Sequence, residues 1–260
     1  MGPLGICIIV AAGVAAACWL LALVTREYSW TDRIWSLAPV AYAWIFAGAA
    51  GLDDARLDLA AVLVTLWGAR LTFNFARKGG YARGGEDYRW SILRAGMPAW
   101  QWQLFNLAFI AAYQNAIIAL MTLPIWTMYQ HQRGFSVWDV LLAILAVALL
   151  VGETVADQQQ WNCHRAKATG STSSGFLTAG LFRFSRHPNY FCEVMFWWVV
   201  FALSIVAAHA ISWTIAGPVL LSLLFVGSIR FTESISASKY PDYAEYRRRT
   251  SGFVPLPARR

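Results

Sequence analysis

Long apolar runs separated by short polar segments constrain the fold of this chain more than any other feature. A helix needs about 20 apolar residues to cross a bilayer, and several of these runs approach that length. The chain is 58% hydrophobic and only 13% charged, whereas a soluble domain carries roughly 25% charged residues. The sequence therefore predicts an all-α, polytopic membrane protein with seven transmembrane helices in a single domain. The expected spans lie near residues 3–24, 34–50, 59–75, 102–126, 137–156, 188–207 and 211–229.

The charge pattern predicts the orientation of these spans. The net charge is +7, and the basic residues cluster after the first, third and fifth runs and in the C-terminal tail. Basic loops stay on the cytoplasmic side, so we expect an outside N-terminus, a cytoplasmic C-terminus and a multi-pass protein of a bacterial inner membrane. We expect contacts with membrane lipids and none with nucleic acid. Thr31 and Asp32 are expected to cap the second span.

The four cysteines show no paired spacing, and three of them lie in or beside apolar runs. We interpret them as small buried apolar residues, so we expect neither a disulfide framework nor a metal site. They are Cys7, Cys18, Cys163 and Cys192.

Residues 181–193 combine two arginines, a histidine and a proline directly before the sixth apolar run. Pro188 favours an extended His187 and is well tolerated in the first turn of a helix. The pattern predicts a helix that begins at Pro188, with Asn189 and Glu193 on one of its faces. A helix N-terminus beside arginines attracts an anionic group.

Further polar residues are expected at the same membrane depth. Glu153 and Asp157 lie four apart at the end of the fifth run, and Arg230 and Glu233 lie at the end of the seventh. An ionisable residue inside a span is a functional hypothesis, because its burial is costly unless it is paired. The alternative is that these residues link helices by ion pairs. Taken together, they predict a polar basket that binds a ligand with several phosphates.

Two basic segments have two interpretations each. In the tail, Tyr240, Tyr243 and Tyr246 recur every three residues, beside a run of arginines. This is typical of an amphipathic helix on the membrane surface, or of a lid over the basket. The glycine-rich segment at residues 79–90 is either a phosphate-binding loop or a flexible basic loop.

Residues 180–193, the segment around Asp157 and the ending at residues 243–255 resemble the C-terminal half of the steroid 5α-reductase family, closest to its bacterial membrane branch with a 3-oxo-5α-steroid 4-dehydrogenase C-terminal domain. The resemblance implies a seven-span reductase that binds NADPH among its cytoplasmic loops. It also implies cofactor roles for Asp157, Asn189, Glu193 and Arg230. Mammalian members place a glutamate on the second span and a tyrosine on the third, and neither is matched here.

The basket and the resemblance together give an expected cofactor set. Its members are Glu153, Asp157, His164, Arg165, Arg186, His187, Asn189, Tyr190, Glu193, Arg230, Tyr240 and Tyr243. Residues 136–260 would then form the cofactor side and residues 1–135 the substrate side. The Arg-His-Pro element also occurs in isoprenylcysteine and phospholipid methyltransferases, so an S-adenosylmethionine-dependent methyltransferase is the alternative.

The expected reaction is hydride transfer from NADPH to the β-carbon of a conjugated enone, in a 3-oxo-Δ4 steroid or similar flat lipid. A hydrogen-bond donor at the carbonyl oxygen stabilises the developing enolate, and Asp32, protonated by burial, or Tyr88 is expected to supply it. An apolar groove is expected to admit the lipid, lined by Trp35, Trp67, Tyr113 and Trp197. We expect a monomer. A non-catalytic lipid-binding protein is a further alternative, although it needs no polyphosphate site.

Overall fold

The computed structural model describes residues 1–171 and 175–258, and over these residues it is helical with no β-strand. The predicted loop at residues 169–175 lies partly outside this range. The elements of the first half are α1 (Pro3–Thr25), α2 (Trp30–Ile34), α3 (Ala38–Ala49), α4 (Ala55–Arg77), α5 (Tyr88–Ala95), α6 (Ala99–Phe105), the π-helix η1 (Asn106–Tyr113) and α7 (Gln114–Gln130). The second half contains α8 (Val137–Ala168), the 3-10 turn η2 (Gly180–Arg183), α9 (Pro188–Ala208), the 3-10 turn η3 (Trp213–Ile215), α10 (Ala216–Lys239) and α11 (Tyr243–Arg249).

Six helical segments of the described chain are long and apolar enough to cross a membrane. They are Pro3–Thr25, Ala55–Arg77, Ala99–Gln130, Val137–Ala168, Pro188–Ala208 and Trp213–Lys239. This confirms a polytopic membrane protein. The number of spans differs from the predicted seven, because the second apolar run does not form one long helix.

That second run is divided into two short helices. α2 ends at Ile34, and the 12-residue α3 begins at Ala38 with a proline in its first turn. At about 1.5 Å per residue, α3 is roughly 18 Å long, well short of the roughly 30 Å of a bilayer core. The predicted cap is also wrong, because Ser29 is the N-cap of α2 and Thr31 instead donates to the Ile110 carbonyl at 3.0 Å.

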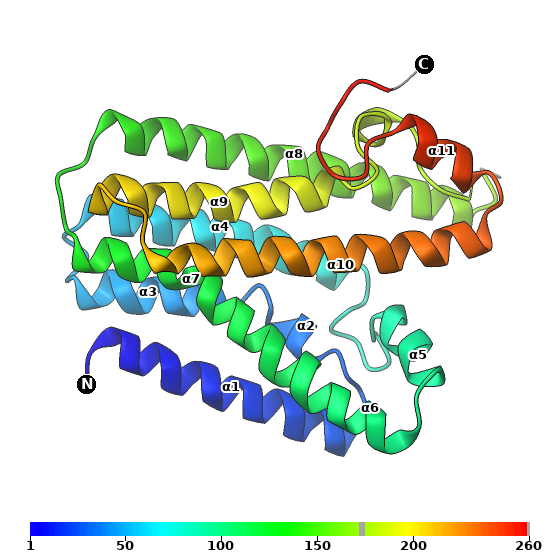
Figure 1. Cartoon of the computed structure of the whole chain (residues 1–260), viewed down its shortest axis with the longest axis horizontal. Coiled ribbons are helices and arrows are strands. Elements are labelled where there is room, and N and C mark those ends of the chain that lie inside the picture. The colour runs from blue at the N-terminus through cyan, green and yellow to red at the C-terminus, as the bar shows by residue number, and fades with distance from the viewer. Residues whose placement is uncertain (172–174, 259–260) are drawn as a thin grey trace. The chain divides into compact units, whose positions relative to one another are not determined.

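The chain divides into two compact units, and the first comprises residues 1–140 and 200–217. In this unit α3 packs against α4 and α7, and α1 packs against α7 and η1 (Figure 1). Small residues permit these approaches. A Cβ on Gly68 would lie 2.5 Å from the Ser36 carbonyl oxygen, and a Cβ on Gly217 would lie 2.2 Å from that of Leu120.

The polar segment between the third and fourth expected spans contains a helix, α5, which Asp87 caps by accepting from the Arg89 backbone N–H. The fourth apolar run is longer than the predicted 102–126, because α6, η1 and α7 are continuous from Ala99 to Gln130. The central part of this segment is a π-helix, in which a backbone N–H donates to the carbonyl five residues earlier. At its end, the Gln114 N–H donates to the Phe109 carbonyl.

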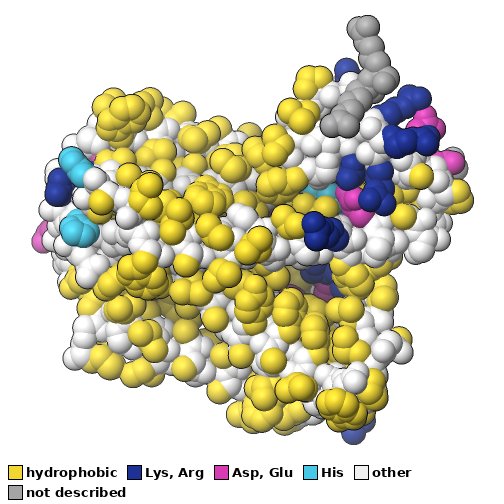
Figure 2. All heavy atoms as spheres, in the orientation of Figure 1, with side chains coloured by type: hydrophobic (Ala, Val, Ile, Leu, Met, Phe, Trp, Pro, Cys, Tyr) yellow, Lys and Arg dark blue, Asp and Glu magenta, His cyan; other side chains and the backbone are white. Residues whose placement is uncertain are grey.

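The second unit comprises residues 141–199 and 218–260, of which the described part ends at 258. In it α8, α9 and α10 run side by side (Figure 1). A Cβ on Gly152 of α8 would lie 3.1 Å from the Cys192 sulfur of α9. Trp198 of α9 donates to the Ser222 hydroxyl of α10 at 3.0 Å. Apolar side chains cover the lengths of these helices, and basic side chains gather over α11 (Figure 2).

A buried ion pair in the first unit gives a test of this packing. Arg56 donates to both oxygens of Asp139, at 2.6 and 2.9 Å, and the two side chains are 2% and 0% exposed. Arg56→Met leaves the Asp139 carboxylate buried without its partner, so we expect a loss of about 3–5 kcal/mol of unfolding free energy. The double variant Arg56→Met/Asp139→Leu removes both charges and should recover most of that loss. Denaturation in detergent measures both, and a double variant no more stable than the single one would contradict this account.

Candidate functional site

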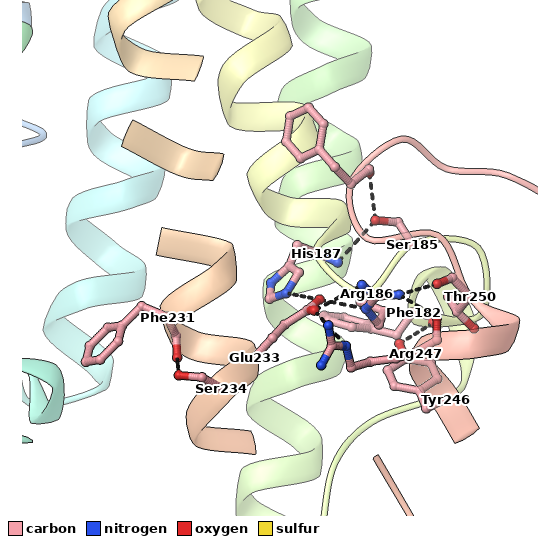
Figure 3. Close-up of polar contacts among 11 residues, drawn as sticks. Phe182, Ser185, Arg186, His187, Phe231, Glu233, Ser234, Tyr246, Arg247 and Thr250 are labelled. Carbon is pink, nitrogen blue, oxygen red and sulfur yellow. Dashed lines mark hydrogen bonds and ion pairs between the residues drawn. The ribbon is translucent and has the colours of Figure 1, made fainter. Parts of the chain in front are cut away.

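The Glu233 carboxylate lies at the centre of the polar end of the second unit. Arg186 donates to it from Nε at 2.6 Å and from Nη2 at 3.0 Å, and His187 Nε2 lies 3.2 Å from it. Arg247 Nε lies 3.4 Å from Glu233 Oε2. Figure 3 shows Arg186 and His187, from the loop before α9, and Arg247, from α11, converging on Glu233 of α10. The Glu233 side chain is only 5% exposed, so it contacts protein cations rather than water.

The Arg-His-Pro sequence acts through this carboxylate. Nη1 of Arg186 donates to the carbonyls of Arg247, at 3.0 Å, and of Thr250, so the guanidinium is fully used by protein groups. Direct binding of an anion by Arg186 and His187 stays a prediction, and in this structure both side chains contact Glu233. Arg186 and His187 position Glu233 and the tail. The remaining basic residues of α11 lie at the surface.

The loop before α9 and the tail are paired like two short strands. The backbone N–H of Arg186 donates to Ser251 at 2.8 Å, and Leu256 N–H donates to Phe184 at 2.9 Å. Ser185 Oγ accepts from the His187 N–H and donates to the Phe253 carbonyl at 2.7 Å. α9 then begins at Pro188, as predicted. This pairing places the tail directly beside the N-terminus of α9.

The tail tyrosines surround a phenylalanine. Rings of Tyr240, Tyr243 and Tyr246 lie 5.8, 5.1 and 5.4 Å from the ring of Phe176. Tyr246 also donates to the Phe182 carbonyl at 2.6 Å. Burial raises the pKa of Tyr243 to about 12 and raises that of Tyr246 as well. The tyrosines thus pack inside the unit. The predicted single helix is divided, because α10 ends at Lys239 and α11 begins at Tyr243.

A buried carboxylate and an amide face each other across α8 and α9. Asn189 Nδ2 donates to Asp157 Oδ1 at 3.1 Å, and the Asp157 side chain is buried. Glu153, one turn earlier on α8, and Glu193, one turn later on α9, are also buried. The Asn189–Asp157 contact brings one polar residue of each helix together, and the cofactor role of these residues stays a prediction.

An arginine-lined pocket of about 340 Å³ opens between α11 and the loop before α9. Arg186, Ala244, Arg247 and Arg248 line it. The exposed guanidinium of Arg248 and the half-exposed one of Arg247 give this pocket a positive potential suited to phosphate. Arg186 connects the pocket to the start of α9, three residues before Asn189.

Three predicted cofactor residues point to solvent. His164 and Arg165, near the end of α8, and Arg230 on α10 are exposed. Tyr190 is half-buried, with its ring 5.2 Å from that of His187 and 4.9 Å from that of Phe225. Tyr190 therefore supports the histidine rather than opening onto a pocket.

The predicted carbonyl donor Asp32 lies in the first unit. Its Oδ2 accepts from Trp90 Nε1 at 2.8 Å. Burial raises the pKa of Asp32, the nearby Asp87 carboxylate raises it further, and the Trp90 hydrogen bond opposes the rise. This environment favours the protonated form on which the donor hypothesis depends. Tyr88, the other predicted donor, is 53% exposed.

The glycine-rich loop next to Asp32 is occupied by protein groups. Glu27 accepts from the Gly84 N–H at 2.8 Å and pairs with Arg33 at 2.6 Å. These two contacts lower the pKa of Glu27. Arg33 also donates to the Gly80 carbonyl at 3.0 Å. A carboxylate thus takes the place that the phosphate-loop interpretation gives to a phosphate.

The four predicted substrate residues differ in burial. The side chains of Trp67 and Trp197 are 0% exposed and are packed in the interior, whereas Trp35 and Tyr113 are half-buried. Tyr113 stacks on Phe109, with ring centroids 5.4 Å apart.

Sequence reasoning gave too little weight to two residues of this site. Glu233 was expected as a member of the basket, and its central place becomes visible only when Arg186, His187 and Arg247 converge on it. Phe176 follows a Ser/Thr/Gly segment and had no signal of its own. The regular spacing of the three tyrosines was the available signal that another aromatic side chain packs against them.

The comparison with protein families assigns the chain. A family described as a protein of unknown function (DUF1295) matches residues 18–250. The chain belongs to the DUF1295 family. The predicted membership of the steroid 5α-reductase family is therefore wrong, since the matched family is a different one and the similar proteins do not include a steroid reductase. An arginine-histidine-proline element before a membrane helix does not by itself identify that family.

The relatives of this DUF1295 protein carry little functional description. An uncharacterized protein of Schizosaccharomyces pombe, C594.04c, is 35% identical over 91% of this chain and 75% of its own length. The cobalt-zinc-cadmium resistance protein CzcN of Cupriavidus metallidurans is 26% identical over 49% of this chain and 56% of its own. The nickel-cobalt-cadmium resistance protein NccN of Alcaligenes xylosoxydans is 29% identical over 47% and 56%. No solved structure matches.

The Glu233 centre predicts a specific failure of the tail. Glu233→Gln replaces the carboxylate by a neutral amide and leaves Arg186 and Arg247 without their counter-charge, at a cost of about 3–5 kcal/mol. We expect the tail to detach and trypsin to cleave after Arg247, Arg248 and Arg249 much faster. Glu245→Gln is the control, since Glu245 forms an exposed pair with Arg249. Equal cleavage rates in the two variants would contradict the central role of Glu233.

The raised pKa of Asp32 predicts a pH-dependent stability. A carboxyl whose folded pKa lies above its unfolded value stabilises the fold fully below the unfolded pKa, near 3.8, and loses that contribution as the pH rises through the folded pKa. Asp32→Asn does not titrate, so it should be more stable than wild type at about pH 7. The difference should shrink at about pH 4. Thermal unfolding at both pH values measures it, and a difference that is independent of pH would refute the assignment.

Proposed function

We propose that this chain is a membrane-embedded oxidoreductase that binds NADPH at the polar end of its second unit and reduces the C=C bond of a conjugated enone in a flat lipid. The observation that carries the proposal is the part-buried contact between Asn189 and Asp157, three residues along the chain from Arg186 of the arginine-lined pocket. A dinucleotide needs both features. Carboxylates and amides bind ribose hydroxyls and the carboxamide, and arginines bind phosphates.

The residues present fit the cofactor in two parts. Asp157 and Asn189, with the buried Glu153 and Glu193 beside them on α8 and α9, form the part that suits sugar and carboxamide groups. Arg247 and Arg248 form the part that suits phosphates. When bound, NADPH supplies a hydride to the β-carbon of the enone. Glu233 holds the arginines in place through Arg186 and Arg247.

Taken within the first unit alone, the carboxyl of Asp32 is our candidate for a hydrogen-bond donor to the oxygen of a bound lipid. Burial raises the pKa of Asp32, which favours its protonated form, and Trp90 Nε1 donates to its Oδ2. A donor held in advance stabilises the negative charge that develops on the oxygen. The expected orientation, with the basic α11 end in the cytoplasm, follows from the positive-inside rule.

Ligand binding to purified protein tests the proposal. We expect NADPH to raise the thermal midpoint and S-adenosylmethionine to leave it unchanged. Asn189→Ala removes the amide that faces Asp157 and should weaken NADPH binding by about tenfold, the effect of one hydrogen bond to a charged group. Asn162→Ala, a change of an exposed asparagine on α8, should leave the affinity unchanged.

Consumption of NADPH in the presence of a 3-oxo-Δ4 steroid such as progesterone then tests the substrate class. Stabilisation by S-adenosylmethionine but not by NADPH would contradict the proposal and favour the methyltransferase alternative. Stabilisation by neither would refute both.

A further inference from the structure

The amide of Asn106 is buried in the first unit without a protein partner. Asn106 is the first residue of the π-helix η1 and is 1% exposed, and neither its Oδ1 nor its Nδ2 has a hydrogen-bond partner among residues 1–171 and 175–258. Trp102 Nε1 and Gln103 Oε1, within the preceding turn, are in the same state. Buried polar groups in folded proteins are nearly always paired. Three such groups on one stretch of helix therefore indicate a bound polar group.

The neighbours of Asn106 show which way its face is turned. Trp102 and Ile110 lie four residues before and after it, on the same buried face. The ring of Trp102 lies 4.8 Å from that of Tyr28, and the Ile110 carbonyl accepts from Thr31. Asn106 therefore faces the segment between α1 and α2, in the cluster that contains Tyr28, Trp90 and Trp102.

The helix departs from regular geometry at this same residue. The π-helical hydrogen-bond pattern begins at Asn106 and continues to Tyr113. Such segments are rare and occur frequently at functional sites, because the wider turn reorients side chains. The coincidence of a π-helix with an unpartnered amide is an independent sign that the position serves a ligand.

A flat aromatic wall runs beside the amide. Trp102 stacks on Phe105, Phe105 on Phe109 and Phe109 on Tyr113, with centroid distances of 5.7, 4.9 and 5.4 Å and interplanar angles of 27°, 20° and 25°. Rings stacked on one another turn their edges outward, and this row of edges is an apolar surface against which a flat body can lie. The opposite face of this helix, with Leu104 and Leu107, is exposed, as expected for a membrane-spanning segment.

The chemistry of these groups defines the ligand. The Asn106 amide offers one donor group and one acceptor, Trp102 offers a donor and Gln103 an acceptor, all of them uncharged. The Arg94 guanidinium lies over the Tyr28 ring, 5.4 Å from its centroid, and Arg33 is engaged by Glu27 and the Gly80 carbonyl. We propose that the Asn106 amide binds the uncharged oxygen, keto or hydroxyl, of a flat apolar lipid that lies against the Trp102–Tyr113 aromatic wall. This site lies within the first unit and does not depend on the NADPH proposal.

Binding of a sterol ketone and of its oxygen-free analogue tests the site. The purified protein in nanodiscs is titrated with radiolabelled 4-cholesten-3-one and with cholestane, which has no oxygen. Asn106→Leu keeps the side-chain size and removes both polar atoms. We expect it to weaken binding of the ketone by about tenfold and to leave cholestane binding unchanged. Asn162→Leu, at an exposed position of α8, is the matched control and should bind both as wild type does.

Stability of the ligand-free protein gives a second readout. If no protein group satisfies the amide, Asn106→Leu should raise the thermal midpoint or leave it unchanged, because an unpaired buried amide is removed. A clear drop in the midpoint would mean that the amide is paired internally, and unchanged ketone binding would mean that the site is elsewhere. Either result overturns the proposal.

A second variant covers the case in which Asn106→Leu does not fold. Trp102→Phe keeps the stacked ring and removes Nε1, and it should weaken ketone binding several-fold; wild-type affinity would overturn the proposal. NADPH affinity should stay at the wild-type value in both variants that fold, so a failure of this site is distinguishable from a failure of the cofactor site.

Discussion

The polar end of the second unit depends on one buried carboxylate. Glu233 receives the bidentate Arg186, His187 and Arg247, and these three residues come from the loop before α9 and from α11. A carboxylate that is only 5% exposed persists when several cations and hydrogen bonds compensate its loss of water. The cations that compensate the buried carboxylate also hold the tail beside α9. The arginine-lined pocket is formed by these same contacts.

The two units show two ways to bury polar groups. In the second unit, the Glu233 cluster and the Asn189–Asp157 pair are satisfied mainly by protein groups, and the basic surface around them suits phosphate. In the first unit, Asn106 and Trp102 Nε1 lack protein partners within the described chain, and the aromatic wall beside them suits an uncharged flat body.

Local physical rules predicted much of the fold. The helix start at Pro188 followed from the fixed φ of proline. The helical period predicted that Asn189 and Glu193 share one face of α9. The break at residues 35–37 did not, because an apolar run has the same composition whether it is one helix or two. The contact of Arg186 with Glu233 was also missed, because a sequence shows which residues are charged but not which of them form ion pairs. A short motif was enough to suggest a family, and the match over residues 18–250 corrected it.

Hydrogen exchange of the full-length protein with and without NADPH is the most direct test of the account. If the second unit binds the cofactor as proposed, NADPH should slow amide exchange at residues 186–193 and in α11, and Glu233→Gln should abolish this protection. Exchange that is unaffected by NADPH, or that is slowed by S-adenosylmethionine instead, would contradict the central claim that the Glu233 cluster organises a dinucleotide site.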